Sequence, residues 1–211
     1  MRLKTQRLTL RDWQPAQDAR YAIDIYGDRR VIDWIDDGSR DESLRQVEGR
    51  LHRYMNTAKL TGNCTGSWAV EQTDIGRVIG HVMLTEMPEI KESGTRYVAT
   101  DDSIEIPAHE SAGAATHYIE ISWHFRPASW GFGYATEAAF CIAQYGFDAL
   151  ALPWLLAVID PGNKRAITVA KRLGMSYDGI TTRDYGGREL SLYKLTAQSL
   201  AAAQSYWLTE S

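Results

Sequence analysis

Residues 119–138 read IEISWHFRPASWGFGYATEA, an apolar run that leads through a glycine-containing turn into residues of helical spacing. The pattern predicts a strand over residues 118–125 and a helix from residue 136 to about 149. Gly131 and Gly133 can adopt backbone angles that other residues resist, so a ligand can approach the main chain closely. The free N–H groups at the start of the helix then point at one spot, where the helix dipole favours an anion such as a phosphate.

Two widespread nucleotide-binding motifs do not match this turn. The sequence has no third glycine at the spacing of a dinucleotide fold, and no Lys-Ser or Lys-Thr follows the turn as it does in a P-loop. A pair of glycines alone is a weak signal. The turn therefore predicts an anion site without identifying the ligand.

The rest of the chain predicts strands and helices in alternation around this segment. The predicted strands cover residues 8–11, 68–71, 78–84, 154–159, 177–181 and 190–195. The predicted helices begin at Pro15, after a capping box at Ser39-Arg40-Asp41-Glu42, at Arg165, and in an Ala-rich tail at about 197–211.

The composition is that of an ordinary globular chain. Of 211 residues, 44% are hydrophobic and 24% are charged, which suits a single domain spanning 1–211. The formal net charge of −4 argues against non-specific binding of nucleic acid. Cys64 and Cys141 are too few for a disulfide framework and lack a metal-ligand spacing, so we expect no metal. No signal or membrane-spanning run is visible, so we expect a cytoplasmic protein without a membrane partner.

An acidic segment at about residues 86–116 interrupts the pattern of strands and helices. Its only basic residues are Lys91 and Arg96. Its acidic residues are Glu86, Glu89, Glu92, Asp101, Asp102, Glu105 and Glu110. We interpret the segment as a loop-rich insertion, either a functional lid or a solvated loop, with a short strand near residues 97–100. In the first case its field would favour a cationic substrate.

Three more runs accompany the glycine turn, and they are Thr5-Gln6-Arg7-Leu8-Thr9-Leu10-Arg11, Trp68-Ala69-Val70 with residues 76–80, and Asp160-Pro161-Gly162-Asn163 leading to Lys171-Arg172-Leu173-Gly174-Met175. Together with residues 120–138 they resemble the GCN5-related N-acetyltransferases (GNAT). More narrowly they resemble the RimJ/RimL-like branch, with its G-Y-W-L-x-P-x-x-W-G-x-G-Y-A-T-E-A and D-P-x-N-x-x-S-I-x-V-x-x-K-L-G-F patterns. The matches run in order from about residue 5 to residue 195, and the insertion is the main departure.

The resemblance implies an α/β (α+β) fold, with a mixed, mostly antiparallel central sheet flanked by helices and a splayed pair of parallel strands. It also implies acetyl-CoA (coenzyme A) as cofactor. In such a site the pantetheine arm binds the backbone of the splayed strand, and the pyrophosphate binds the amides of the glycine turn. The implied cofactor-binding residues are Trp123, His124, Phe125, Gly131, Phe132, Gly133, Tyr134, Ala135, Thr136 and Asn163.

The chemistry implied is direct attack of a substrate amine on the acetyl thioester in a ternary complex. It requires a base for the ammonium, a donor for the developing oxyanion and an acid for the departing thiolate. Many family members have a Tyr as general acid at the position of Ala170, and some RimJ/RimL-like members have a Ser at the position of Ala166. The usual proton donor is therefore absent from this sequence.

Candidates for the catalytic roles are Glu120, Ser122 and His124, which alternate along one strand and share a face, and Asn163, which contacts the cofactor arm or orients the amine in the family. His124 titrates near neutrality and is either a base or relay, or an imidazole hydrogen-bonded within the sheet. Glu120 is either a base acting through water or a structural carboxylate. Three aromatic residues are candidates for the site or for the core, namely Trp34, Trp68 and Tyr193. Glu137, in the first helical turn, is interpreted as structural.

Two functions follow. The first is N-acetylation of a primary amine, on a small molecule or at a protein N-terminus, by a monomer or a homodimer. The alternative is a catalytically degenerate acyl-CoA-binding or sensor module, which the alanines at 166 and 170 favour.

Overall fold

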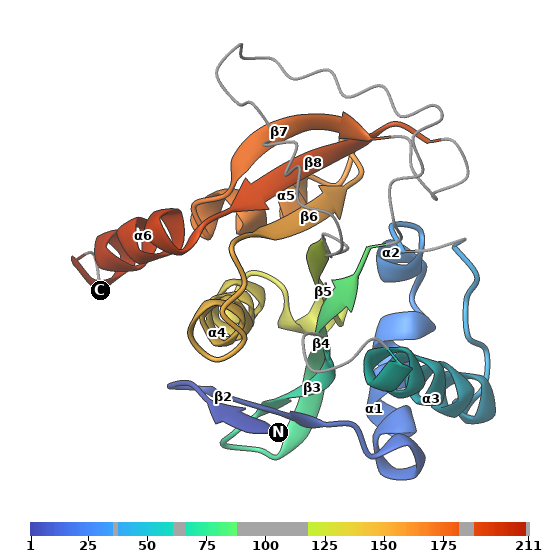
Figure 1. Cartoon of the computed structure of the whole chain (residues 1–211). Coiled ribbons are helices and arrows are strands. Elements are labelled where there is room, and N and C mark those ends of the chain that lie inside the picture. Colours follow the sequence, from blue (N-terminus) through green and yellow to red (C-terminus); the bar gives the residue numbers. More distant parts are fainter. Residues whose placement is uncertain (36–37, 61–65, 88–117, 182–187, 210–211) are drawn as a thin grey trace.

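A computed structural model describes residues 1–35, 38–60, 66–87, 118–181 and 188–209, and these residues form a mixed eight-stranded sheet (Figure 1). The order across the sheet is β1-β2-β3-β4-β5-β6-β8-β7, and every neighbouring pair is antiparallel except β5 and β6. The strands are β1 (Arg2–Lys4), β2 (Leu8–Asp12), β3 (Gly66–Gln72), β4 (Arg77–Glu86), β5 (Ile119–Phe125), β6 (Leu155–Ile159), β7 (Ser176–Thr181) and β8 (Leu190–Leu195). The predicted mixed, mostly antiparallel sheet with one parallel pair is confirmed.

Helices cover both faces of the sheet (Figure 1). They are α1 (Pro15–Tyr26), α2 (Arg29–Ile32), α3 (Leu44–Leu60), α4 (Tyr134–Asp148), α5 (Lys164–Arg172) and α6 (Ala197–Thr209). One buried core lies between the sheet and α4 with α5, and a second lies between the sheet and α1 to α3. Alternation along β4 serves both cores, because Val78 belongs to the α1–α3 core and Ile79 to the α4 core.

The predicted strands and helices in the described ranges agree with the observed ones to within two residues, apart from the start of α3. The capping box lies at Ser43 and Gln46 rather than at residues 39–42. Ser43 Oγ accepts from Gln46 N at 3.3 Å, and Gln46 Oε1 accepts from Glu42 N at 2.8 Å. The prediction was wrong because Ser39 and Asp41 serve another purpose: the Ser39 carbonyl and the Asp41 carboxylate accept hydrogen bonds from Arg50.

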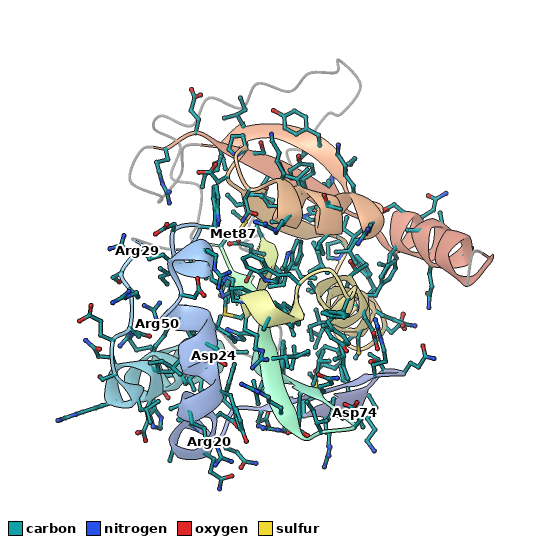
Figure 2. All side chains as sticks on the ribbon, turned by 180° about the vertical axis from the view of Figure 1, so that it is seen from behind. Arg20, Asp24, Arg29, Arg50, Asp74 and Met87 are labelled. Atoms are coloured by element: carbon teal, nitrogen blue, oxygen red, sulfur yellow. The ribbon has the colours of Figure 1, made fainter. Side chains whose placement is uncertain are left out.

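Ion pairs tie α1 to the sheet. Arg11 on β2 donates to both carboxylate oxygens of Asp18 on α1, at 2.8 and 2.9 Å, and also contacts Glu71 on β3. Asp24, labelled on α1 in Figure 2, pairs with Arg77 at 3.0 Å and with Arg126 at 3.1 Å. These contacts hold α1 against β2, β4 and the end of β5, and β5 carries the candidate site.

Several sequence predictions lie outside the described residues: the acidic insertion from residue 88 onward, its short strand, and the turns at residues 62–63 and 186–187. Within the described ranges, no helix combines the length and the apolar character needed to cross a membrane.

Candidate functional site

The strands β5 and β6 separate almost as soon as they meet. Their parallel ladder contains the single register pair Glu120–Leu156, whereas the other edge of β5 is paired with β4 along its whole length. From Ile121 onward the β6-facing edge of β5 therefore has no strand partner among the described residues. A cavity of about 600 Å³ opens there, and its lining comes from both faces of the sheet.

On the α4 face the cavity is lined by the glycine turn. Gly131 has φ +86° and Gly133 has φ +79°, both in the region that favours glycine. Helix α4 begins at Tyr134, two residues before the predicted start, and Gly133 gives it no side-chain cap. The first N–H groups of the helix are thus left for another acceptor.

Thr136 also indicates that the turn binds a ligand. Its side chain is nine-tenths buried and lines the cavity, and its hydroxyl has no hydrogen-bond partner among the described residues. A buried hydroxyl without a partner costs free energy unless a ligand satisfies it. The turn, the uncapped helix and this hydroxyl together fit a bound phosphate or pyrophosphate.

The N-terminal segment holds the turn in place. Glu137 accepts from Thr5 Oγ1 at 2.5 Å and from Arg7 N at 2.9 Å, and it pairs with the Arg7 guanidinium at 2.7 Å. Arg7 also donates to the Phe132 carbonyl at 3.0 Å and lies over the Tyr134 ring. The structural interpretation of Glu137 agrees with these contacts, and they explain why the Thr5–Arg11 run accompanies the glycine turn.

The residues of β5 divide between the two faces. Ile119, Ile121 and Phe125 belong to the α4 core, with Trp123 packed against it. Glu120, Ser122 and His124 alternate with them and lie opposite Thr85, Met83 and His81 of β4. All three line the cavity, so the structure brings the predicted strand residues together on the α1–α3 face, across the sheet from the glycine turn.

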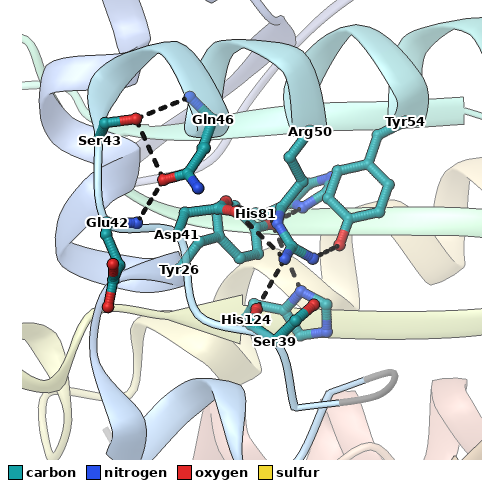
Figure 3. A network of polar contacts seen from close by, with 10 residues as sticks. All are labelled: Tyr26, Ser39, Asp41, Glu42, Ser43, Gln46, Arg50, Tyr54, His81 and His124. Atoms are coloured by element: carbon teal, nitrogen blue, oxygen red, sulfur yellow. Dashed lines mark hydrogen bonds and ion pairs between the residues drawn. The ribbon is translucent and has the colours of Figure 1, made fainter.

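His124 belongs to a buried polar network (Figure 3). Its Nδ1 is 3.5 Å from the Tyr26 hydroxyl, which makes a short hydrogen bond to His81 Nδ1. His81 Nε2 is 2.8 Å from the Ser67 hydroxyl. Tyr54, which accepts from Arg50 at 3.3 Å, packs its ring against His81. The network holds the His124 ring at the cavity wall.

The expectation that His124 titrates near neutrality was wrong. Burial, with a smaller effect of the Arg50 charge, lowers the pKa of His124 to about 3. Burial and the neighbouring His124 likewise lower the pKa of His81 well below its usual value. Both imidazoles are therefore neutral at pH 7, because desolvation disfavours the charged form.

Sequence reasoning missed the other members of the network around His124, namely Tyr26, Arg50, Ser67 and His81. Two signals were available. His81 interrupts the apolar run of residues 78–84, and Arg50 falls on the apolar face of its helix, three residues after Val47. Arg50 is only 5% exposed, and its guanidinium contacts the buried Asp41 carboxylate at 2.7 Å.

Helix α5 supplies part of the cavity wall on the α4 face. Asn163 lines the cavity and caps the helix, because its Oδ1 accepts from Ala166 N at 3.2 Å. Ala166 faces the cavity with a methyl group, whereas Ala170 is fully buried in the core. Arg165 at the start of α5 and Arg172 at its end add positive charge to this wall. The Arg165 guanidinium lies over the Trp130 ring.

The three aromatic candidates lie in different environments, one at the cavity and two in the core. Trp34 lines the cavity and is 40% exposed. Trp68 is buried in the α4 core with its ring against Tyr145, and Tyr193 is buried with its ring against Tyr177. Packing is therefore the observed environment of Trp68 and Tyr193.

Known proteins resemble this chain in sequence. Residues 7–176 match the model of the acetyltransferase (GNAT) domain. The chain is 46% identical over 59 residues to the uncharacterized protein YkkB of Bacillus subtilis (28% of this chain, 34% of YkkB). It is 40% identical over 63 residues to the uncharacterized N-acetyltransferase YnaD of the same organism (30% of this chain, 37% of YnaD). The matched stretches thus span only about a third of these two relatives.

Solved structures resemble the whole fold. Mycobacterium smegmatis RimJ in complex with CoA-disulfide superposes with a TM-score of 0.69 at 17% identity, covering 96% of this chain and 89% of RimJ. That likeness concerns the fold alone. The family match, which covers most of the sequence, goes further, and the chain belongs to the GNAT family of acetyltransferases.

Proposed function

We propose that this acetyltransferase uses acetyl-CoA to acetylate a primary amine, on a small molecule or at a protein N-terminus. The observation that carries the proposal is the cavity that crosses the sheet where β5 and β6 separate. It joins an anion-binding turn on the α4 face to the polar side chains of β5 on the α1–α3 face. We place the chain in the RimJ/RimL-like branch on its motif residues, and as one cytoplasmic domain spanning 1–211.

The α4 face fits the cofactor. Its pyrophosphate would be held by the N–H groups at the start of α4 and by the Thr136 hydroxyl, and its pantetheine arm by the unpaired edge of β5 at Trp123 to Phe125. Asn163 and Arg165 would flank it. Acetyl-CoA, when bound, supplies the acetyl group as a reactive thioester.

The α1–α3 face fits the amine. Among its candidates, Glu120 is a carboxylate and can accept a proton from an ammonium directly or through one water. His124 is neutral, so we assign it to orienting the amine by a hydrogen bond rather than to titration. Ser122 lies between them on the same face and can supply a further hydroxyl contact.

The alternative, an acyl-CoA-binding module without turnover, draws support from Ala166, which presents no hydroxyl to the cavity. Release of free thiol from acetyl-CoA over a panel of amines separates the two functions. An acetyltransferase releases thiol with at least one amine, while a sensor binds CoA and releases none.

The cofactor site can be tested with a matched pair of glycine variants. Gly133→Val places a side chain at φ +79° in the turn, and we expect calorimetry to show that CoA binding is lost while the protein stays folded. Gly76→Val imposes comparable backbone strain at φ +61° in the β3–β4 turn, with no atom within 4 Å of the new Cβ, and should leave CoA binding unchanged. Undiminished affinity in folded Gly133→Val protein would disprove the assignment of the turn.

A further inference from the structure

The guanidinium of Arg165 lies in the cavity wall beside the glycine turn. Arg165 is the second residue of α5, its side chain is exposed, and its guanidinium carbon lies 4.5 Å from the centre of the Trp130 ring. Both residues line the cavity together with Gly131 and Gly133. A positive charge from α5 therefore lies next to the turn that fits a bound anion.

Trp130 gives this side chain a fixed support. Its Nε1–H donates to the Phe125 carbonyl at the end of β5, at 2.8 Å, and its ring packs against both buried cores. Trp130 also immediately precedes Gly131, so the support and the turn belong to one segment. Contact with the Trp130 ring therefore limits the conformations open to the long Arg165 side chain and keeps its guanidinium close to the turn.

The N–H donors of Arg165 are available to a ligand. A contact with an aromatic ring leaves these donors without an acceptor atom, and the Arg165 side chain forms no hydrogen bond or ion pair within the described part of the chain. Other charged groups of the lining are engaged elsewhere. Arg30 is bound to the Asp28 carboxylate at 2.6 Å, and the Asp160 carboxylate accepts from Gly162 N at 2.8 Å.

The stability of α5 does not explain a positive charge at this position. Cations are favourable near the C-terminus of a helix and unfavourable near its N-terminus, and Arg165 lies in the first turn, which contains no acidic residue. A bound anion would relieve this repulsion, because it would be attracted both by the guanidinium and by the positive end of the helix.

We propose that Arg165, held against Trp130, binds a phosphate group of the cofactor beside the α4 turn, with its N–H groups donating to the phosphate oxygens. This inference rests on the proposed function. It adds a charged side chain to a site that otherwise offers backbone N–H groups and the Thr136 hydroxyl. A guanidinium suits this role because its planar fork of donors matches two oxygens of one phosphate.

Calorimetric titration of CoA into the wild type and three variants tests the role of Arg165. Arg165→Met should weaken CoA binding about tenfold, the lower end of the range for hydrogen bonds to a charged group, because the side chain is exposed. Arg165→Lys keeps the charge but loses the fork, and should recover part of the loss. Lys171→Met removes an exposed cation from the last turn of the same helix, outside the cavity lining, and should change the affinity by less than about twofold.

Salt and dephospho-CoA show which group Arg165 binds. The CoA affinity of the wild type should fall as the NaCl concentration rises, since salt screens an exposed ionic contact, and it should fall less steeply in Arg165→Met. Dephospho-CoA lacks the 3′-phosphate and keeps the pyrophosphate. An equal loss of affinity for CoA and dephospho-CoA in Arg165→Met would identify the pyrophosphate as the bound group, and a loss confined to CoA would identify the 3′-phosphate.

The failures of the two proposals are distinguishable. If the wild type does not bind CoA, or binds it and releases no thiol with any amine, the proposed function fails. If the wild type binds CoA and releases thiol, but Arg165→Met keeps the CoA affinity and the salt dependence of the wild type, only the inference about Arg165 fails. Urea titrations accompany the binding measurements, and we expect Arg165→Met to be at least as stable as the wild type because it removes a cation from the start of α5.

Discussion

On the α4 face of the sheet the candidate site is made mainly from backbone groups of one continuous segment, with a few side chains from Thr136 and α5, whereas on the α1–α3 face it is made from side chains. The first consists of the turn at residues 131–136 and the edge of β5. The second draws on α1, α3, β3, β4 and β5, which meet around Tyr26, His81 and His124 (Figure 3). A backbone site tolerates change in most side chains, while a side-chain network depends on every member, so the two faces should respond differently to mutation.

The largest effect is expected from Arg50→Met on the α1–α3 face. The change leaves the Asp41 carboxylate, 8% exposed, without its ion-pair partner, and should lower the free energy of unfolding by about 3–5 kcal/mol in urea titrations. Arg45→Met on the exposed side of α3 should stay within about 0.5 kcal/mol. Folded Arg50→Met protein should still bind CoA normally. A parallel loss of CoA affinity would show that the faces are coupled.

The histidines of the α1–α3 face should also make the stability of the protein depend on pH. The folded-state pKa of His124, about 3, lies below the unfolded value of about 6.5, so between these values the unfolded chain binds more protons. Stability is therefore complete above about pH 6.5 and falls as the pH drops, by up to about 1.4 kcal/mol per pH unit for each such histidine. His81 adds in the same direction.

Urea unfolding between pH 7.5 and pH 4.5 measures this slope. His124→Gln should make it shallower, whereas His52→Gln, on the exposed part of α3, should leave it as it is. Equal slopes in the wild type and His124→Gln would contradict the lowered pKa of this imidazole.

The smallest effect is expected on the α4 face, from Thr136→Val. Removing the hydroxyl should weaken CoA binding about three- to tenfold, the range of one hydrogen bond, while stability stays equal or rises slightly because a buried hydroxyl without a partner is lost. Thr9→Val removes a hydroxyl that lies 3.2 Å from Thr73 Oγ1. It should show the reverse, a small loss of stability with normal CoA affinity. Calorimetry measures the CoA affinity of both variants, and urea titration measures their stability.

The same contrast explains what the sequence could predict. The glycine turn, the strand before it and the helix after it are local, so their residues could be read in order, and α4 was predicted to within two residues. The sharing of a face by Glu120, Ser122 and His124 follows from alternation along one strand, and the structure agrees. The fold class was predicted through the resemblance carried by the four runs.

What the sequence could not predict depends on contacts between distant segments. The neutral state of His124 follows from burial under α1 and α3, and strand periodicity does not report burial from another layer. The capping box was misplaced because Ser39 and Asp41 have the right residue types but bind Arg50 eleven and nine residues away. The position of Trp34 at the cavity likewise depends on its contact with the turn at Gly162, which no local pattern contains.

The clamp of Thr5 and Arg7 on Glu137 joins residues 132 and 130 positions apart. Closing so long a loop has an entropic cost that grows with the logarithm of its length, and contacts of high sequence separation slow folding. The glycine turn is local in sequence, yet we expect its final geometry to depend on docking of the segment between β1 and β2 against α4. We therefore expect the turn to become competent to bind a ligand only late in folding, after the sheet has assembled around it.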